Sequence, residues 1–180
     1  MPNSLIINEV LLPGGGVIGI VQCPGRIYAN DTGCRIHGDL TADLDVLEAW
    51  GGQIMVSLIE GHEFKSLGVP DFEAAVKSRN LRWYHLPIAD MDVPGNAFIQ
   101  SWAEHGFDIL RTLEQGGRIV VHCAGGLGRS GMIAAKLMTA FGIPPLEAIA
   151  QVRKVRPGAI ETQAQENYVM NGPELTITPV

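Results

Sequence analysis

The sequence predicts an α/β fold: a single domain built on a central, mostly parallel sheet that is flanked by helices. The chain of 180 residues has about the length of one domain and can bury its own core. Its 22 glycines and 11 prolines divide it into short pieces, in which apolar runs of strand length alternate with segments of helical spacing. We therefore expect one domain over residues 1–180, with its core at about residues 16–172.

Four short apolar runs have the composition of buried strands, rich in branched residues and separated by turn residues. They are Gly16–Gln22, Gln53–Ile59, Leu81–Leu86 and Arg118–His122. Because all of them fall far short of the roughly 20 apolar residues that cross a bilayer, we expect no membrane contact.

Six segments with apolar residues near helical spacing separate or follow these strands. They are Leu40–Trp50, Asp71–Ser78, Ala97–Gln115 and, with approximate ends, Arg129–Phe141, Pro145–Val155 and Thr162–Met170. Asp39 or Thr41 is expected to cap the first segment. One broad face of the third is expected in the core: Phe98, Trp102, Phe107, Leu110 and Leu113. Alternating strands and helices favour a parallel sheet, in which ligands bind beyond the carboxyl ends of the strands.

Composition and charge exclude several classes of protein. Apolar residues make up 46% of the chain, which is too much for a disordered segment. Thirteen basic and nineteen acidic side chains give the chain a formal net charge of −6, which argues against a nucleic-acid partner. Met1–Leu12 lacks the basic leader of a signal peptide, so we expect a cytoplasmic protein.

The residues after the fourth strand carry the strongest chemical signal. The segment His122–Ser130 has the sequence HCAGGLGRS, and a His-Cys pair followed at this distance by Arg and Ser is rare by chance. Its three glycines open backbone conformations that are closed to other residues, so successive N–H groups can turn inward around an anion at a helix N-terminus. We therefore predict a phosphate-binding loop between a strand and a helix, formed by Ala124, Gly125, Gly126, Leu127, Gly128 and Arg129.

Cys123 and Arg129 supply the reactive groups of this loop. Beside a helix N-terminus the pKa of a thiol falls from about 8.5 into the range ~3.5–7.5, so we expect Cys123 to be an ionised nucleophile. The planar fork of Arg129 can hold two phosphoryl oxygens at once. Together these residues can bind a phosphate ester and attack its phosphorus.

The motif His122-Cys123-x5-Arg129-Ser130 resembles the signature of the cysteine-dependent protein tyrosine and dual-specificity phosphatases. Two further segments are similar to parts of this family: Pro87–Asp90 to its acid loop, and Arg156–Gln165 to the end of its catalytic domain. The likeness is closest to cyclin-dependent kinase-associated phosphatase-like members. The aromatic phosphotyrosine-recognition loop of the classical enzymes has no counterpart, which favours the dual-specificity type.

Hydrolysis through a thiol needs an acid that protonates the departing alkoxide or phenolate. Asp90 follows a predicted strand and lies on a loop that can close over a substrate. Asp92 is the rival acid, and both carboxylates could instead cap the helix that begins near Asn96. The resemblance selects Asp90 as the general acid.

The resemblance also implies roles for residues around the loop. Gln165 lies where the family has the glutamine that positions water, while Glu161 replaces a second glutamine found in some relatives. Ser130 can donate a hydrogen bond to the sulfur as it leaves, or merely cap the helix. His122 is expected to be buried and to orient the loop without moving protons.

The remaining cysteines and histidines predict neither a metal nor a cofactor. Cys23, Cys34 and Cys123 cannot all pair, and their spacing matches no zinc ribbon. We expect free thiols, the alternative for the first two being a protective disulfide with an oxidised active-site thiol. Four histidines show no ligand spacing: His37, His62, His85 and His105.

The resemblance implies a phosphatase that hydrolyses phosphotyrosine, and by extension phosphoserine and phosphothreonine, in a phosphorylated protein through a cysteinyl phosphate. Two other hypotheses stay open: a phosphoprotein-binding module that has lost turnover, and a rhodanese-like sulfur carrier. The basic run Arg153, Lys154 and Arg156 is either a solvated helix end or a guide for the phosphoprotein.

Overall fold

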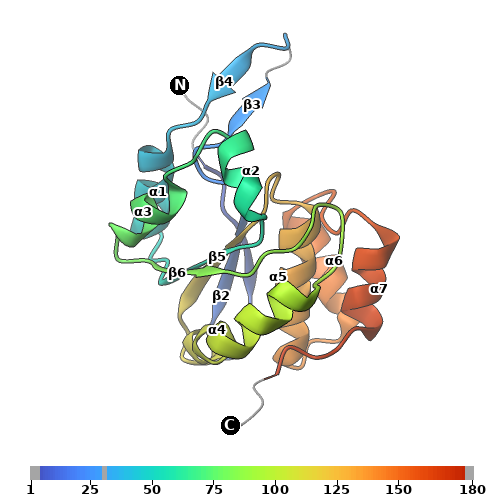
Figure 1. The fold of residues 1–180 in the computed structure, drawn as a ribbon. Helices are drawn as coiled ribbons and strands as arrows, with labels where there is room; N and C mark the ends of the chain where they lie inside the picture. Colours follow the sequence, from blue (N-terminus) through green and yellow to red (C-terminus); the bar gives the residue numbers. More distant parts are fainter. Residues whose placement is uncertain (1–4, 30–31, 177–180) are drawn as a thin grey trace.

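A five-stranded sheet forms the centre of the molecule (Figure 1), in a computed structural model that describes residues 5–29 and 32–176. Both ends of the predicted domain and residues 30–31 lie outside this description. The sheet has the order β1-β2-β7-β5-β6, in which β1 is antiparallel to β2 and the other neighbours are parallel. Its strands are β1 (Asn8–Leu11), β2 (Val17–Val21), β5 (Ile54–Ser57), β6 (Arg82–His85) and β7 (Arg118–His122).

The four predicted strands are the parallel part of this sheet, so the predicted α/β fold is confirmed. Every residue of β2 and β5 is buried, as expected for parallel strands that are covered on both faces. The edge strand β1 was not predicted, because Val10 is the one buried residue among its four.

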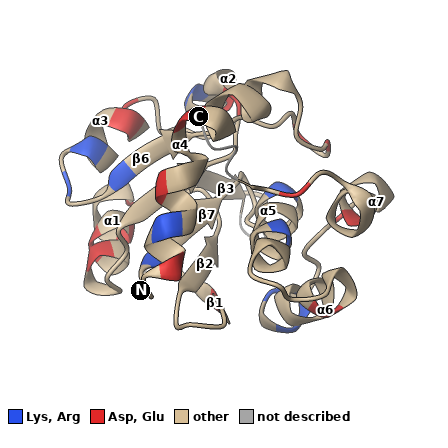
Figure 2. Ribbon diagram, turned by 90° about the horizontal axis from the view of Figure 1, so that it is seen from below, with Lys and Arg blue, Asp and Glu red and all other residues tan. Residues whose placement is uncertain are grey.

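Helices cover both faces of the sheet. Figure 2 shows α1 and α3 on one side and α5, α6 and α7 on the other, while α4 contacts β6 and β7. The helices are α1 (Leu40–Ala49), α2 (Gly61–Ser66), α3 (Phe72–Lys77), α4 (Asn96–Glu114), α5 (Gly128–Ala140), α6 (Pro145–Val155) and α7 (Gln163–Asn171). All six predicted helices are present, and α2 is a further helix that was not predicted.

The helix caps distinguish between the candidates that the sequence offered. Asp39 caps α1, since its Oδ1 accepts a hydrogen bond of 3.0 Å from the Ala42 N–H. Thr162 caps α7, and Gln165 closes the reciprocal pair at the same helix end. Asp90 and Asp92 do not cap α4, whose N-cap is Gly95.

One aromatic residue of α4 departs from the predicted core face. Phe98 and Leu113 are buried, whereas Phe107 is 52% exposed. Phe107 is nine residues after Phe98, which at about 100° per residue is half a turn around the helix. It therefore lies on the opposite face, and its assignment to the core was wrong.

The short helix α2 and a separate β-hairpin complete the fold. The hairpin consists of β3 (Ile27–Ala29) and β4 (Arg35–His37) and projects beyond the main sheet (Figure 1). Its base is joined to the end of α2 by a hydrogen bond of 2.8 Å from the Ile27 N–H to the Leu67 carbonyl. These elements were not predicted because strands of three residues are too short to show a period, and α2 has no buried residue and therefore no apolar face.

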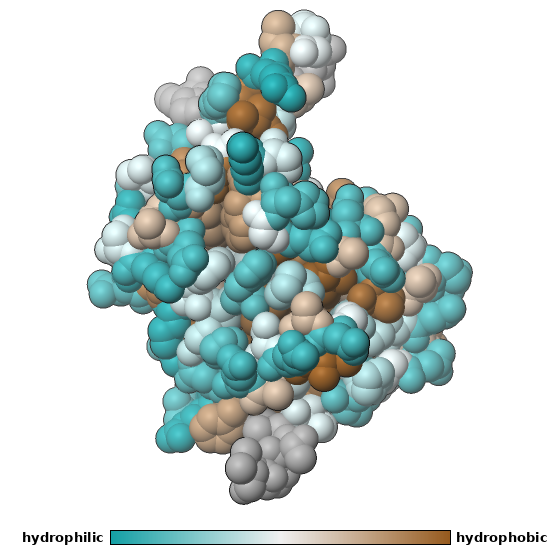
Figure 3. Space-filling model, in the orientation of Figure 1, coloured by the Kyte–Doolittle hydropathy of each residue, from teal (hydrophilic) through white to brown (hydrophobic). Residues whose placement is uncertain are grey.

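The surface carries charges of both signs, which are interspersed in Figure 2. The face in Figure 3 is largely hydrophilic, with apolar side chains in separate patches. Within residues 5–29 and 32–176, no helix combines the length and the apolar character needed to cross a membrane.

Candidate active site

The signature loop lies at the carboxyl end of β7, the central strand of the sheet. It runs from Cys123 to Leu127 and leads directly into α5. Cys123 is 3% exposed, and its Sγ lies 3.3 Å from the Ser130 Oγ on the first turn of α5. The loop, the thiol and the helix N-terminus are therefore assembled as a single structural unit.

The three glycines of the loop serve different purposes, which corrects the prediction that all of them adopt special backbone angles. Gly126 alone has a positive φ, of 69°, and a Cβ there would lie 2.5 Å from the Gln22 backbone nitrogen. At Gly128 a Cβ would lie 2.5 Å from the Glu161 Oε2. Gly125 has more room, its nearest neighbour being the Arg26 Nη1 at 3.7 Å from such a Cβ.

Three successive carbonyls of the loop are held by donors outside it. The Arg26 Nη1 donates to the Ala124 carbonyl at 2.7 Å. The Arg156 Nη2 and Nε donate to the Gly125 and Gly126 carbonyls at 2.9 and 3.0 Å. Because the C=O and N–H of a trans peptide point in opposite directions, these bonds direct the following N–H groups inward. The anion cradle is therefore held open from its outer side.

The basic run at the end of α6 combines exposed charges, as in the solvated-end alternative, with arginines that bind backbone carbonyls. Arg156 binds the loop, and Arg153 donates to the Ala159 and Ile160 carbonyls at 3.1 Å each. Arg153 is thus held by the segment that leads to α7, and Arg156 by the loop itself. Arg153 and Lys154 are both exposed at the surface, and the Arg153 Nη2 also lies 2.8 Å from the Glu166 Oε2.

Arg129 is almost completely buried and has partners on three sides. Its Nη1 and Nη2 bind the two oxygens of Glu63 at 2.7 and 2.9 Å, and Nη1 also donates to the Ile88 carbonyl at 3.0 Å. Its Nη2 lies 3.0 Å from the Asp90 Oδ1. The remaining edge of the guanidinium is formed by Nε and by the Nη2 hydrogen that points away from Glu63. Asp90 lies at this edge, which is also the edge that an anion would bind.

Glu63 is a residue of the site that the sequence analysis missed. It lies on α2, and its carboxylate accepts hydrogen bonds from Arg129 and, at 2.7 Å, from the Glu60 N–H. Burial by itself would raise the pKa of Glu63, but the bonds from Arg129 and Glu60 outweigh it and lower the pKa. A usable signal was its position just after β5, at the same edge of the sheet as Cys123.

His122 is fully buried and lies at the end of a chain of hydrogen bonds. The Trp83 Nε1 donates to the Ser57 Oγ at 2.8 Å, and Ser57 lies 2.5 Å from the His122 Nε2. Burial lowers the pKa of His122 to about 4. The neutral ring then accepts from Ser57 at Nε2 and donates from Nδ1 to the Cys123 carbonyl at 3.2 Å. Ser57 and Trp83 had no assigned role in the sequence analysis.

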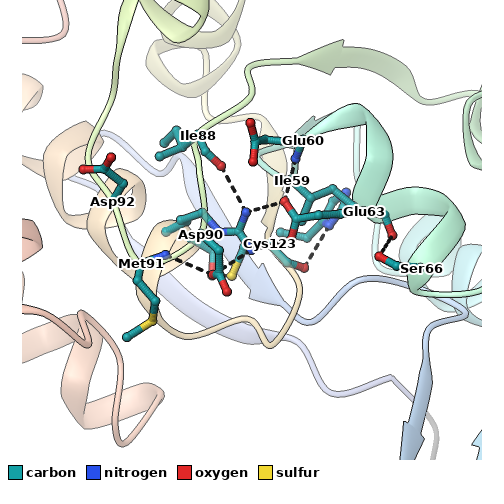
Figure 4. A network of polar contacts seen from close by, with 12 residues as sticks. Ile59, Glu60, Glu63, Ser66, Ile88, Asp90, Met91, Asp92 and Cys123 are labelled. Carbon is teal, nitrogen blue, oxygen red and sulfur yellow. Dashed lines mark hydrogen bonds and ion pairs between the residues drawn. The ribbon is translucent and has the colours of Figure 1, made fainter.

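The two candidate acids lie in different surroundings. Asp90 is directed towards Arg129 and Cys123, while Asp92 is directed away from them (Figure 4). The Asp92 Oδ1 accepts from the Val93 N–H at 2.8 Å. The geometry thus brings Asp90 to the phosphate loop and leaves Asp92 outside it.

Gln165 is fully buried next to the first residue of α5. Its Oε1 accepts from the Glu161 N–H at 2.9 Å, and its Nε2 donates to the Asp92 carbonyl at 3.3 Å. The amide is therefore held in one orientation between the acid loop and α5, and it is not the solvent-facing polar residue that its position on a helix would suggest.

Cys23 and Cys123 are free thiols. Cys23 is buried next to the loop, and burial raises its pKa, whereas Cys34 is exposed. Within the same residues, no three His, Cys, Asp or Glu side chains are grouped so that they could hold a metal ion.

Comparison with known proteins agrees with this arrangement. Residues 24–169 match the family described as Swiss Army Knife protein, DSP-PTPase phosphatase domain (PTP-SAK). Cyclin-dependent kinase inhibitor 3 of Homo sapiens is 30% identical over 155 residues, which cover 84% of this chain and 69% of that protein. Protein tyrosine phosphatase PRL-1 of Leishmania major is 33% identical over 107 residues, which cover 56% of this chain and 61% of that protein.

A solved structure shows the same fold. Kinase associated phosphatase, crystallised with its catalytic site cysteine substituted by serine, superposes with a TM-score of 0.81 at 26% identity over 94% of both chains. These matches favour the phosphatase hypothesis over the sulfur carrier and the binding module. The chain therefore belongs to the DSP-PTPase family of cysteine-dependent protein phosphatases.

Proposed function

We propose that this phosphatase hydrolyses phosphotyrosine, together with phosphoserine and phosphothreonine, in phosphorylated proteins through a cysteinyl phosphate at Cys123. The observation that carries the proposal is the assembly of Cys123, Arg129 and Ser130 around inward-directed amides, with Asp90 at the open side. The proposed catalytic unit spans about residues 16–172. The free thiols of Cys23 and Cys123 fit a reducing compartment such as the cytoplasm, which we propose as its location.

In the first step the Cys123 thiolate attacks phosphorus, and the bond from phosphorus to the ester oxygen breaks. The N–H groups of the loop and the guanidinium of Arg129 bind the three remaining oxygens, where charge builds up in the transition state. Asp90 gives its proton to the leaving oxygen, which departs as an alcohol or a phenol.

Phosphate binding must displace Asp90 from Arg129. Glu63 and the Ile88 carbonyl occupy the other hydrogens of the two terminal nitrogens, so the edge shared by Nε and Nη2 is the one left for two phosphoryl oxygens. Once the phosphate takes this edge, the Asp90 carboxyl is released from Arg129 and can reach the leaving oxygen. The substrate itself thus converts Asp90 from an ion-pair partner into a general acid.

In the second step water attacks the phosphocysteine, with Asp90 now acting as the base. Gln165 lies beside the start of α5 with its amide fixed by three backbone groups, which suits it to position that water. Ser130 stabilises the sulfur as it leaves, through the contact of 3.3 Å between Oγ and Sγ.

The test is phosphate release from p-nitrophenyl phosphate and from phosphopeptides. Cys123→Ser should abolish turnover. Asp90→Ala should slow phosphopeptides at least tenfold more than the aryl phosphate, whose leaving group hardly needs a proton. Asp92→Ala is the matched control and should stay within about twofold of the native chain. Turnover by Cys123→Ser, or equal effects at Asp90 and Asp92, would reject the mechanism.

A further inference from the structure

Arg26 lies outside the signature motif, but its side chain reaches the phosphate loop. It follows β2 and donates from Nη1 to the Ala124 carbonyl at 2.7 Å, the shortest of the arginine bonds to the loop. Its Nε is buried and, of the buried side-chain nitrogen and oxygen atoms in the described residues, is the one that lacks a hydrogen-bond partner. The proposed mechanism gives this arginine no task.

The position of Arg26 is fixed by a tight turn packed against α1. The Gly25 N–H donates to the Asp43 Oδ2 at 2.8 Å, and the Arg26 N–H donates to the Cys23 carbonyl at 3.2 Å. Gly25 has a φ of 72°, and a Cβ there would lie 2.6 Å from the Cβ of Leu40. The turn therefore holds the arginine at one place beside the loop.

The contact acts on the loop through one peptide group. The Ala124 carbonyl accepts from Arg26 and also, at 3.1 Å, from the Cys23 N–H, so its direction is doubly fixed. The Gly125 N–H belongs to the same peptide and points the opposite way, into the cradle. A charged donor on the carbonyl also polarises the peptide and strengthens that N–H as a donor.

The contacts of Arg26 make it a poor stabiliser of the fold. A hydrogen bond to one carbonyl is offset by a buried Nε that gave up water without a replacement. A buried donor without a partner is uncommon and calls for a functional explanation. The side-chain hydrogen bond of Arg26 is made to the loop, and we look for the explanation there.

We propose that Arg26 is a positioning residue for phosphate ester hydrolysis. It fixes the peptide between Ala124 and Gly125 and places a positive charge beside the cradle, which increases the affinity for a phosphate dianion and favours the Cys123 thiolate. Arg26 does so from the β2 side of the loop, and Arg156 holds the next two carbonyls from the α6 side. The inference deepens the proposed function and rests on it.

The test compares Arg26→Met, which keeps the aliphatic stem, and Arg26→Lys, which keeps the charge, with Lys154→Met, which removes a charge from the exposed end of α6. Three quantities are measured on the full chain: the inhibition constant of inorganic phosphate, kcat/KM for p-nitrophenyl phosphate, and the pH profile of Cys123 alkylation by iodoacetamide, read on its peptide by mass spectrometry. Thermal unfolding reports on the fold.

Arg26→Met should weaken phosphate inhibition about tenfold, lower kcat/KM by a similar factor and move alkylation to higher pH, with little change in thermal stability. Arg26→Lys should keep the native alkylation profile and lose part of the phosphate affinity. Should Arg26→Met not fold, Arg26→Gln carries the same expectation. Lys154→Met should behave as the native chain.

An unchanged inhibition constant and alkylation profile in folded Arg26→Met would overturn the inference, and so would equal changes in Lys154→Met. Turnover by Cys123→Ser would instead overturn the proposed function. If Cys123→Ser is inactive but Arg26→Met behaves as the native chain, the role of Arg26 is rejected and the proposed function stands.

Discussion

Arg129 illustrates at the scale of a residue how a motif acquires its geometry. The motif supplies a guanidinium, but Glu63, Ile88 and Asp90 decide which of its edges faces the substrate. Ion pairing with these carboxylates and with the charge of Cys123 outweighs burial and raises the pKa of Arg129 further. A buried charge with one bidentate contact, to Glu63, and single contacts to Ile88 and Asp90 keeps a single orientation, which a free arginine would not.

Replacing Glu63 should therefore impair phosphate binding more than folding. In Glu63→Gln one acceptor remains, but the ion pair is lost and Arg129 is no longer held at its far edge, so kcat/KM should fall about tenfold. Steady-state kinetics with p-nitrophenyl phosphate measures the effect. Glu73→Gln, which removes an exposed carboxylate on α3 paired with Lys77, is the control, and equal losses in the two variants would contradict the role of Glu63.

The acid sensitivity of the fold should depend on His122. Its pKa is about 4 in the folded chain and about 6.5 in the unfolded chain. Between these pH values the unfolded chain therefore binds more protons at this residue than the folded chain does. Stability should then decrease as the pH falls from about 6.5 to about 4, by roughly 3 kcal/mol in total. Urea unfolding across this range measures it.

His122→Asn should flatten this pH dependence, whatever its effect on the absolute stability. His37→Asn, on the exposed strand β4, should leave the dependence as it is. Parallel curves for the native chain and His122→Asn would show that another group carries the proton.

At the scale of elements, the loop and α5 form one rigid body. Every residue of α5 from Gly128 to Met138 is buried, since the helix lies between the sheet and the pair α6 and α7. Such burial on all sides is tolerated because the polar side chains are paired: Arg129 with Glu63, and Ser130 with the thiol. The N-terminus of the helix, which faces the phosphate, thus has a fixed direction.

Gly126→Ala should distort this rigid body. A Cβ at Gly126 would lie 2.5–2.6 Å from the backbone of Val21 and Gln22, so β2 or the loop must shift, and turnover should fall at least a hundredfold. Gly14 has a φ of 93° with no atom within 4 Å of an added Cβ. Gly14→Ala therefore isolates the cost of the backbone angle, about 1 kcal/mol, and should retain turnover. Near-native kinetics in Gly126→Ala would refute the tight fit.

At the scale of the whole molecule, the chain beyond α7 is fastened to the helix that carries the site. Lys136 of α5 is 1% exposed at its side chain, and its Nζ donates to the Gly172 carbonyl at 2.9 Å and to Glu174 at 3.2 Å. The buried ammonium and these partners hold the segment after α7 against α5. The contact lies towards the C-terminal end of α5, at the opposite end from the loop.

Lys136→Met should lower the free energy of unfolding by about 1–3 kcal/mol, because the Gly172 carbonyl loses its donor. The turnover of the folded enzyme should not change. Denaturant unfolding and kinetics on the same sample separate the two effects. Glu174→Gln should cost less, since Glu174 is 54% exposed. A loss of turnover without a loss of stability would show that this contact serves the site instead.

Local chemistry in the sequence was sufficient for the fold class and for the centre of the site. The spacing of apolar residues and the local composition located six helices and the strands β2, β5, β6 and β7. Each of these elements is long or apolar enough to show its pattern within a few residues. The spacing from His122 to Ser130 marked the loop, because its parts are adjacent in the chain.

The partners of that loop were decided by tertiary structure. Four residues reach Arg129, His122 and the loop carbonyls from segments 30 to 98 positions away in sequence: Glu63, Ser57, Arg26 and Arg156. Sequence alone therefore determined which chemical groups the protein possesses. Tertiary packing around the sheet determined which of these groups touch, because hydrogen bonds depend on distances in space that short-range sequence patterns do not encode.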